Sequence, residues 1–480
     1  MIKPYQQNNK KKIVLLSLSV AITSLLSFSN VANASAAVPA LTEHTAVENN
    51  NVDVKQARTS NETLQEWKSW TNDHAYSLTS IQPEKLEKQH IPSSNFDDLA
   101  MLKPLLHDKR IVFLGESSHG VAEFNLAKTR IIQFLHQEMD YNVLAFESGM
   151  GNVMNAQGQI DKQAAQQTMK DAIFGVWWTK ETLPLFDYAK KTQQTDKPLV
   201  LAGFDIQQQG AFTNGDWLKN SDLAKQFSNV EEQLAQWSSS KDLQGYQKAK
   251  PSIIDIYTQV KSQVKLKEAE LKSAYPNEPH IVKLMERTLT DRIRLANEYV
   301  ELTIQSNIEI EKNNPEPFLK TMEWRDQAML ENLLWLSTEI YPAEKFIVWA
   351  HNDHIRKAQS EVMGSPYPVK LMGERLPDIY KKYSYVLGLY MAGGETANNM
   401  REPMEVLPPV KGSVEDILST THKPYTFIDL RNRQNERGNS WMFEPRLSYS
   451  WGIMQESLVP RDQYDGLLLI DKVSMPNYLK

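Results

Sequence analysis

Residues 111–123 read IVFLGESSHGVAE, and this stretch decides the fold class of the chain. It begins with four apolar residues, continues into the polar turn GESSHG over 115–120, and leads into a helical apolar pattern over 124–138. The apolar stripe of this helix comprises Phe124, Ala127, Ile131, Phe134 and Leu135. A buried strand that passes through a turn into an amphipathic helix is typical of an open α/β sheet. The turn therefore brings Glu116 and His119 to the sheet edge where ligand crevices form.

Six further apolar runs predict the other strands of this sheet. They cover 143–146, 199–202, 346–350, 385–389, 426–430 and 467–470. Most of these runs lack alternation of apolar and polar residues, as expected where helices cover both faces of a mainly parallel sheet. We therefore predict an α/β protein with a three-layer α/β/α core and a mainly parallel central sheet.

One long region, about 222–313, has no strand signal and shows helical periodicity throughout. Its middle holds the sequence YPNEP over 275–279, whose two prolines suit a turn between helices. We predict an inserted long helical hairpin. Such an insertion can serve as a wall or lid over the crevice, or equally as an arm for packing or dimer contact.

The N-terminus has the three regions of an export signal. Lysines at 3 and 10–12 precede an apolar run over 13–28, and Ala32-Asn33-Ala34 follows. This pattern predicts a signal peptide over 1–34, with an uncleaved anchor as the alternative. Residues 35–62 are rich in Ala, Asn, Val and Thr and predict a flexible linker. We expect a secreted or cell-envelope protein with no stable membrane span after cleavage.

Composition excludes several classes of function. The formal charge is −6, from 53 basic and 59 acidic residues, and no basic stripe is interleaved with aromatic residues. Nucleic acid is therefore not an expected partner. The chain has no cysteine, so disulfides, a thiol nucleophile and a thiolate metal site are excluded.

Ionisable side chains follow four successive predicted strands. Glu116 and His119 follow the first strand, Glu147 the second, Asp205 the third, and the pair His351 and His354 the fourth. Because the carboxyl ends of parallel strands share one sheet edge, we expect these groups to converge. Burying several unpaired charges without use would be costly, so the sequence favours an enzyme.

These residues carry a resemblance to a known family. The segment 115–123 resembles the GE-x-x-HG-x-x-E motif of the erythromycin esterase family, and other motifs of that family occur in the same order. They are Phe146-Glu147, the GFDIQ segment 203–207, Trp324-Arg325-Asp326 with Asn332, and the WAHNDHI segment 349–355. The resemblance spans roughly 99–471 and implies a single esterase-like hydrolase domain over 63–480. It implies hydrolysis of a small-molecule ester or macrolactone, with a macrolide antibiotic as one candidate substrate.

The resemblance also implies roles for the catalytic candidates. His119 is expected to act as the general base on water, with Glu116 and Glu147 orienting and supporting it. His351, His354 and Arg325 are the candidates for stabilising the negative charge on the carbonyl oxygen. No G-x-S-x-G motif occurs in the chain, in agreement with a water nucleophile. We predict no cofactor and no metal ligand.

Substrate contacts are assigned to a second set of residues, Glu123, Arg130, Asp205, Trp177 and Trp178. Glu123 lies one helical turn beyond His119 and can equally be a solvated or capping carboxylate. The family has an arginine in this helix, which favours Arg130 over Lys128 by chemistry but not by spacing. The pair Trp177-Trp178 suits the face of a sugar or macrocycle, or is simply core. Trp441, Phe443 and Trp451 line the pocket or are buried elsewhere.

Two other functions use the same residues. The cluster of Glu and His side chains can instead bind zinc or manganese and generate a metal-bound hydroxide. A non-catalytic protein could use the same crevice to bind a polysaccharide, haem or a cell-envelope partner.

Overall fold

The computed structural model describes residues 59–86, 90–431 and 434–480. The predicted signal peptide, and the predicted linker up to residue 58, lie outside the described residues. Asn61 and Glu62, which the sequence places in the linker, are the first residues of α2 (Asn61–His74), because the side chain of Ser60 caps this helix.

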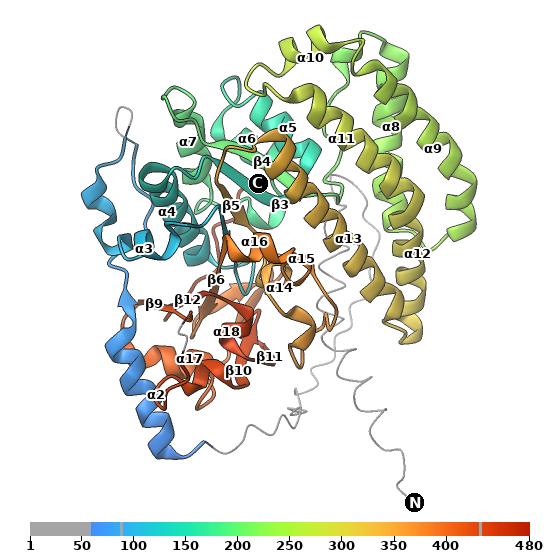
Figure 1. The fold of residues 1–480 in the computed structure, drawn as a ribbon. Coiled ribbons are helices and arrows are strands. Elements are labelled where there is room, and N and C mark those ends of the chain that lie inside the picture. The colour runs from blue at the N-terminus through green and yellow to red at the C-terminus, as the bar shows by residue number, and fades with distance from the viewer. Residues whose placement is uncertain (1–58, 87–89, 432–433) are drawn as a thin grey trace, which may run out of the picture.

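A central eight-stranded sheet organises the chain, in the order β1-β9-β12-β6-β2-β5-β3-β4 (Figure 1). Its strands are β1 (Tyr76–Ser77), β2 (Ile111–Leu114), β3 (Val143–Gly149), β4 (Val200–Asp205), β5 (Phe346–Trp349), β6 (Ser384–Met391), β9 (Tyr425–Asp429) and β12 (Gly466–Ile470). The six strands from β12 to β4 in this order are parallel. At one edge, β9 pairs in antiparallel fashion with β12 on one side and with β1 on the other. The predicted mainly parallel sheet is confirmed, and each of the seven apolar runs forms one of its strands.

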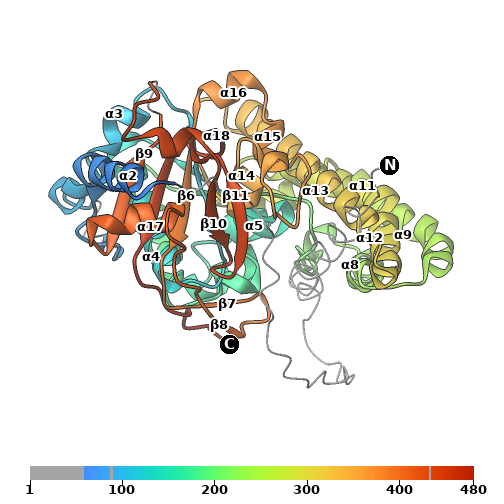
Figure 2. The same ribbon diagram turned by 90° about the horizontal axis from the view of Figure 1, so that it is seen from below.

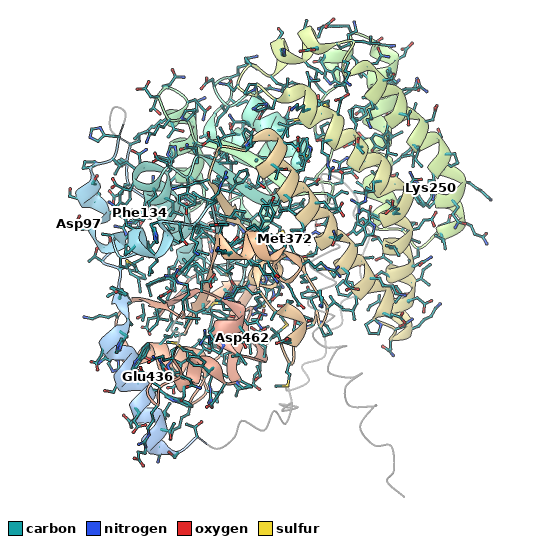
Figure 3. All side chains as sticks on the ribbon, viewed as in Figure 1. Asp97, Phe134, Lys250, Met372, Glu436 and Asp462 are labelled. Atoms are coloured by element: carbon teal, nitrogen blue, oxygen red, sulfur yellow. The ribbon has the colours of Figure 1, made fainter. Side chains whose placement is uncertain are left out.

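Both faces of the sheet are buried, as the continuous apolar strands predict. In β2, Ile111 and Phe113 belong to one core cluster, while Val112 and Leu114 belong to the other. One layer contains α3 (Leu102–Leu106), α4 (Ala122–Met139), α6 (Ala165–Ala172) and α7 (Leu183–Thr192), and α5 (Met150–Gly158) contributes to both cores. Side chains fill the layers between the sheet and its helices, with Phe134 of α4 buried in the second core (Figure 3).

The other layer includes α2 and a helical array that stands beside the sheet (Figures 1 and 2). The array consists of α8 (Ser221–Ser238), α9 (Leu243–Gln263), α10 (Glu268–Ala274), α11 (Ile281–Arg294), α12 (Val300–Glu309) and α13 (Glu316–Trp335). The proline-containing turn lies between α10 and α11, as its sequence indicates. A further break over 239–242 separates α8 from α9, where Asp242 caps the new helix. Among the described residues, no helix has the length and apolar character needed to cross a membrane.

Short elements complete the chain between the strands of the sheet. They are α14 (Asn352–Ile355), α15 (Met372–Arg375), α16 (Asp378–Lys382), α17 (Val414–Leu418), α18 (Pro460–Gln463), the pair β7 (Glu395–Ala397) and β8 (Pro403–Glu405), and the hairpin β10 (Arg446–Ser450) and β11 (Met454–Leu458). The pair β7–β8 and the hairpin β10–β11 contact the 115–120 turn: Gly120 bridges Ala397, and the backbone N of Trp451 donates to the carbonyl of Ser117 at 2.7 Å. The sequence did not predict these four strands, nor β1 at the edge of the central sheet.

Candidate active site

The ionisable groups that follow the four predicted strands do converge. In the sheet, β2, β5, β3 and β4 are consecutive neighbours and run in the same direction, so their carboxyl ends lie side by side. The rings of His119 and His351 lie 5.0 Å apart between centroids. The bulk of each side chain in the set is buried. One site therefore contains the groups that the sequence places at the strand ends.

His119 is held by a fully buried carboxylate. Its Nδ1 lies 2.6 Å from Oε1 of Glu116, which also accepts a hydrogen bond from the indole Nε1 of Trp177 at 2.8 Å. The other oxygen of Glu116 accepts from Nζ of Lys128 at 2.6 Å. Burial opposes ionisation of Glu116, but Lys128 and His119 outweigh it and lower the pKa of this carboxyl. Glu116 is therefore an ionised acceptor that fixes the proton of His119 on Nδ1.

The remaining nitrogen of His119 is available for chemistry. Among the described residues, the hydrogen bonds of this ring involve Nδ1 alone. Burial lowers the pKa of His119 below its usual value, even though Glu116 acts in the opposite direction. The ring is therefore neutral at neutral pH, with a lone pair on Nε2, which is the state that a general base needs.

His354 has the opposite character. Its Nδ1 lies 2.8 Å from Asp326 and its Nε2 lies 3.1 Å from Glu147. Burial disfavours the charged ring, but Asp326 and Glu147 prevail and raise the pKa of His354 to about 10. Its two N–H groups are thus occupied by carboxylates. His354 can act on a substrate through its charge, whereas direct donation would require it to leave one of these partners.

Arg325 is also bound within the protein, through its Nε and Nη2. Its Nη2 donates to Glu147 at 2.9 Å and to Asp205 at 2.5 Å, and its Nε lies 3.2 Å from both oxygens of Asp205. The second oxygen of Glu147 accepts from the backbone N of His351 at 2.9 Å. Arg325 therefore links the ends of β3 and β4 to α13, and Asp205, proposed from the sequence as a substrate contact, is paired with this arginine.

His351 has an unused polar atom. Its Nδ1 lies 3.3 Å from both the backbone N and Oδ2 of Asp353. Of these two contacts, the one with the backbone N–H has hydrogen-bond geometry, so a singly protonated ring carries its proton on Nε2. That Nε2 is buried and has no hydrogen-bond partner among the described residues. A buried donor without a partner is costly, and at a candidate site it marks a position where a ligand atom is expected.

Three residues proposed as substrate contacts lie elsewhere. Glu123 accepts from the backbone N and the hydroxyl of Ser474, at 2.8 and 2.7 Å, so it holds a later segment of the chain. Arg130 donates to Asp98, to two backbone carbonyls and to no member of the site. Trp178 donates to the carbonyl of Ile173 at 2.8 Å, while its neighbour Trp177 supports Glu116. These contacts favour structural roles for Glu123, Arg130 and Trp178.

The sequence interpretation missed Lys128 and Asp326 as parts of the site. Lys128 is completely buried, and its Nζ also lies 4.1 Å from the centre of the Trp349 ring. It is four residues after Phe124 and three before Ile131, so a lysine flanks the apolar stripe. That position could have revealed a buried charge. Asp326 lies in the Arg325-Asp326 motif, but no role was assigned to it.

The opposite protonation states of the two histidines can be measured directly. In NMR titrations of the imidazole nitrogens, we expect His119 to stay neutral until the pH falls below about 6.5 and His354 to stay doubly protonated until it nears 10. The variants His119→Asn and His354→Gln assign the signals. Titration of both rings near pH 6.5 would contradict this assignment.

The raised pKa of His354 also makes the stability of the fold depend on pH. The charged ring contributes its full stabilisation of the folded state below about pH 6.5, and this contribution is lost as the pH approaches 10.

Removing the charge of Lys128 should destabilise the fold. Lys128→Met leaves the buried Glu116 with only His119 and Trp177, so we expect a loss of about 3 kcal/mol in the free energy of unfolding, measured with urea. Lys103→Met is the control, because Lys103 pairs with Glu138 on the surface at 2.8 Å and its loss should cost less than about 1 kcal/mol. Equal losses in the free energy of unfolding would show that the buried ion pair of Lys128 stabilises the fold no more than the surface pair of Lys103.

Comparison with known proteins agrees with the motifs. The erythromycin esterase family model matches residues 136–473. A putative hydrolase, YbfO of Bacillus subtilis (strain 168), is 32% identical over 421 residues, which cover 85% of this chain and 91% of the relative. Erythromycin esterase type II of Escherichia coli is 24% identical, over 72% of this chain and 86% of its own. A crystal structure of a Bacillus cereus protein superposes with a TM-score of 0.67 at 20% identity, covering 87% of this chain and 99% of that one. The chain belongs to the erythromycin esterase family.

Proposed function

We propose that this chain is an ester hydrolase in which His119 activates a water molecule. The observation that carries the proposal is the pair of imidazole Nε2 atoms, one an available acceptor on His119 and the other an unpartnered donor on His351, in rings 5.0 Å apart. Family membership supports hydrolase chemistry, and the pair supplies the two groups that hydrolysis of an ester requires.

The reaction proceeds by addition and elimination. Nε2 of His119 takes a proton from water as the water oxygen forms a bond to the ester carbonyl carbon. The resulting oxyanion accepts a hydrogen bond from Nε2 of His351 and lies in the field of the cations His354 and Arg325. When the intermediate collapses, the C–O bond to the alcohol breaks, and His119 returns its proton to the departing alkoxide. One water is consumed, and one acid and one alcohol are formed.

Glu116 keeps the base in the correct state. Because its Oε1 accepts from Nδ1 at 2.6 Å, His119 presents its lone pair on Nε2 and does not flip. As His119 gains a proton, the carboxylate stabilises the new imidazolium, which lowers the barrier rather than the energy of the free enzyme. Glu147 does not contact His119 but holds the groups around it in place, since it bridges Arg325, His354 and the backbone of His351.

The function is tested on the purified protein lacking residues 1–34. 4-Nitrophenyl acetate, acylated saccharides and macrolides are incubated with the enzyme, and the products are analysed by mass spectrometry for the gain of one water. We expect an ester or a macrolactone to be opened, and EDTA to leave the rate unchanged. Loss of activity with EDTA and its return with one divalent ion would support the metal-dependent alternative. Tight binding of a saccharide or haem with no hydrolysis of any ester would support the non-catalytic alternative.

We also propose that the protein acts outside the cytoplasm, on the basis of the export pattern in residues 1–34. Expression of the full chain in a bacterial host, fractionation and sequencing of the N-terminus test this. We expect a secreted or envelope-associated protein that begins at Ser35. Recovery of the protein in the cytoplasm with Met1 intact would contradict the proposal.

A further inference from the structure

The tip of the β10–β11 hairpin has a backbone conformation that aromatic residues avoid. Trp451 has a φ of +58° and Gly452 a φ of +74°, so both lie in the left-handed region. Asparagine and glycine favour such positions in tight hairpin turns, because a larger side chain is crowded there. A tryptophan at this position indicates that its side chain is required, since residues in unfavourable backbone conformations cluster at functional sites.

The ring of Trp451 contacts both histidines of the proposed reaction. It stacks on His351 with centroids 5.2 Å apart and planes 24° apart, and it meets His119 edge-on at 5.3 Å and 87°. The backbone N of Trp451 donates to the carbonyl of Ser117, in the turn that carries His119. The backbone of Trp451 is thus bound to the turn that carries His119, while its side chain covers the ring of His351.

The second strand of the hairpin reaches His351 by a separate route. Glu456 of β11 pairs with the fully buried Arg356, whose Nη1 donates to Oε2 of Glu456 at 3.0 Å. The same Nη1 lies 3.1 Å from Asp353, and the other oxygen of Asp353 lies 3.3 Å from Nδ1 of His351. His351 is therefore contacted on its face by the hairpin tip and on its Nδ1 edge by a chain of charges that begins in β11.

We infer that Trp451 is a positioning residue that fixes the plane of the His351 ring, and with it the direction of the unpartnered Nε2, relative to His119. The inference rests on the proposed function. Stacking determines the plane of the imidazole, and the contacts of Asp353 at Nδ1 determine its rotation within that plane. Both constraints are needed, because a donor acts on a developing oxyanion only when it is aimed at the position of that oxygen.

The test compares two substitutions of the same residue. Trp451→Phe keeps an aromatic face over His351, whereas Trp451→Asn removes it and suits the left-handed backbone of the turn. With 4-nitrophenyl acetate, we expect kcat of the Phe variant to stay within about threefold of wild type, and kcat of the Asn variant to fall at least about tenfold with KM changed less than about twofold. Trp70→Asn is the matched control, because Trp70 stacks on His74 in α2 with centroids 4.1 Å apart, away from the site.

A second measurement requires no turnover. In the NMR spectrum of the Asn variant, the ring protons of His351 should lose the shift caused by the indole and broaden, while the Nδ1 proton of His119 bound to Glu116 should persist. An unchanged His351 signal together with wild-type kcat would overturn the inference. A loss of kcat that merely follows the folded fraction, as in Trp70→Asn, would overturn it too. If wild-type enzyme hydrolyses no ester, the proposed function fails, and the NMR result still decides whether Trp451 holds the ring.

Discussion

Replacing His119 with asparagine is expected to lower kcat for ester hydrolysis by about 10³-fold, within the range that general bases contribute. Asparagine can still donate to Glu116 from its amide, so the buried carboxylate keeps one partner in place of Nδ1. It has no basic nitrogen at the position of Nε2, and water must then attack without transferring its proton to the enzyme. The rate is measured as kcat with 4-nitrophenyl acetate or the best substrate of the screen.

The control for this experiment is His107→Asn. His107 is an exposed histidine in the segment that precedes β2, and its Nδ1 lies 3.0 Å from the carbonyl of Pro104. We expect wild-type kcat for this variant. The affinity of His119→Asn for a non-hydrolysed substrate analogue should change little, since the proposed loss concerns the transition state. If His119→Asn hydrolyses the ester at the wild-type rate, His119 is not the base and the proposed mechanism fails.

The sequence was sufficient for seven of the eight strands of the sheet, because most of them contain a continuous apolar run, whereas the two-residue strand β1 was not predicted. Burial on both faces favours apolar residues at every position, so β2, β5, β12 and the first four residues of β3 are easily recognised. The hairpin β10–β11 was missed for the opposite reason. Its strands, RLSYS and MQESL, are rich in polar residues, and their buried polar groups find partners only in the folded chain. Its role at the site could not be predicted without those partners.

The sequence located the helix that carries Lys128 and Arg130, but it could not decide which of these two side chains faces the site. Two residues apart on a helix, they point in directions about 200° apart, and they flank the apolar stripe on opposite sides. Lys128 faces Glu116, whereas Arg130 faces Asp98. Chemical similarity to the family's arginine favoured Arg130, but the helical phase and the turn that precedes α4 decide which cation reaches the site. Only the position of α4 against β2 resolves that choice.

The histidines illustrate a second limit. His119, His351 and His354 are alike in the sequence, each close to the end of an apolar strand, and all three were assigned direct catalytic roles. Their partners separate them: Glu116 leaves Nε2 of His119 available, while Asp326 and Glu147 occupy both nitrogens of His354. Asp326 lies on another element, α13, 28 residues before His354, so the charge on His354 could not be deduced from its own segment.

Arg325→Met is expected to have the largest effect on stability, a loss of about 5 kcal/mol in the free energy of unfolding. The substitution keeps much of the side-chain volume but leaves Glu147 and Asp205 buried without their shared cation. Burial then favours protonation of these carboxyls, so part of the loss should be recovered at low pH, where a neutral carboxyl is less costly. Urea denaturation at pH 7.5 and pH 5 measures both effects.

Two further variants make this expectation specific to the buried cluster. Arg294→Met removes an arginine that pairs with Glu331 and Glu298 at the partly exposed face of the helical array, and it should cost less than about 1 kcal/mol. In Arg325→Met, Glu147 still faces the charged His354 at 3.1 Å, whereas Asp205 has lost its cation. Asp205→Asn added to Arg325→Met removes this unpaired charge, so the double variant should be more stable than Arg325→Met alone. A loss below about 1 kcal/mol in Arg325→Met would mean that water reaches Glu147 and Asp205. The strand ends would then form an open, hydrated cleft, and the cation would contribute little to the field that stabilises the oxyanion.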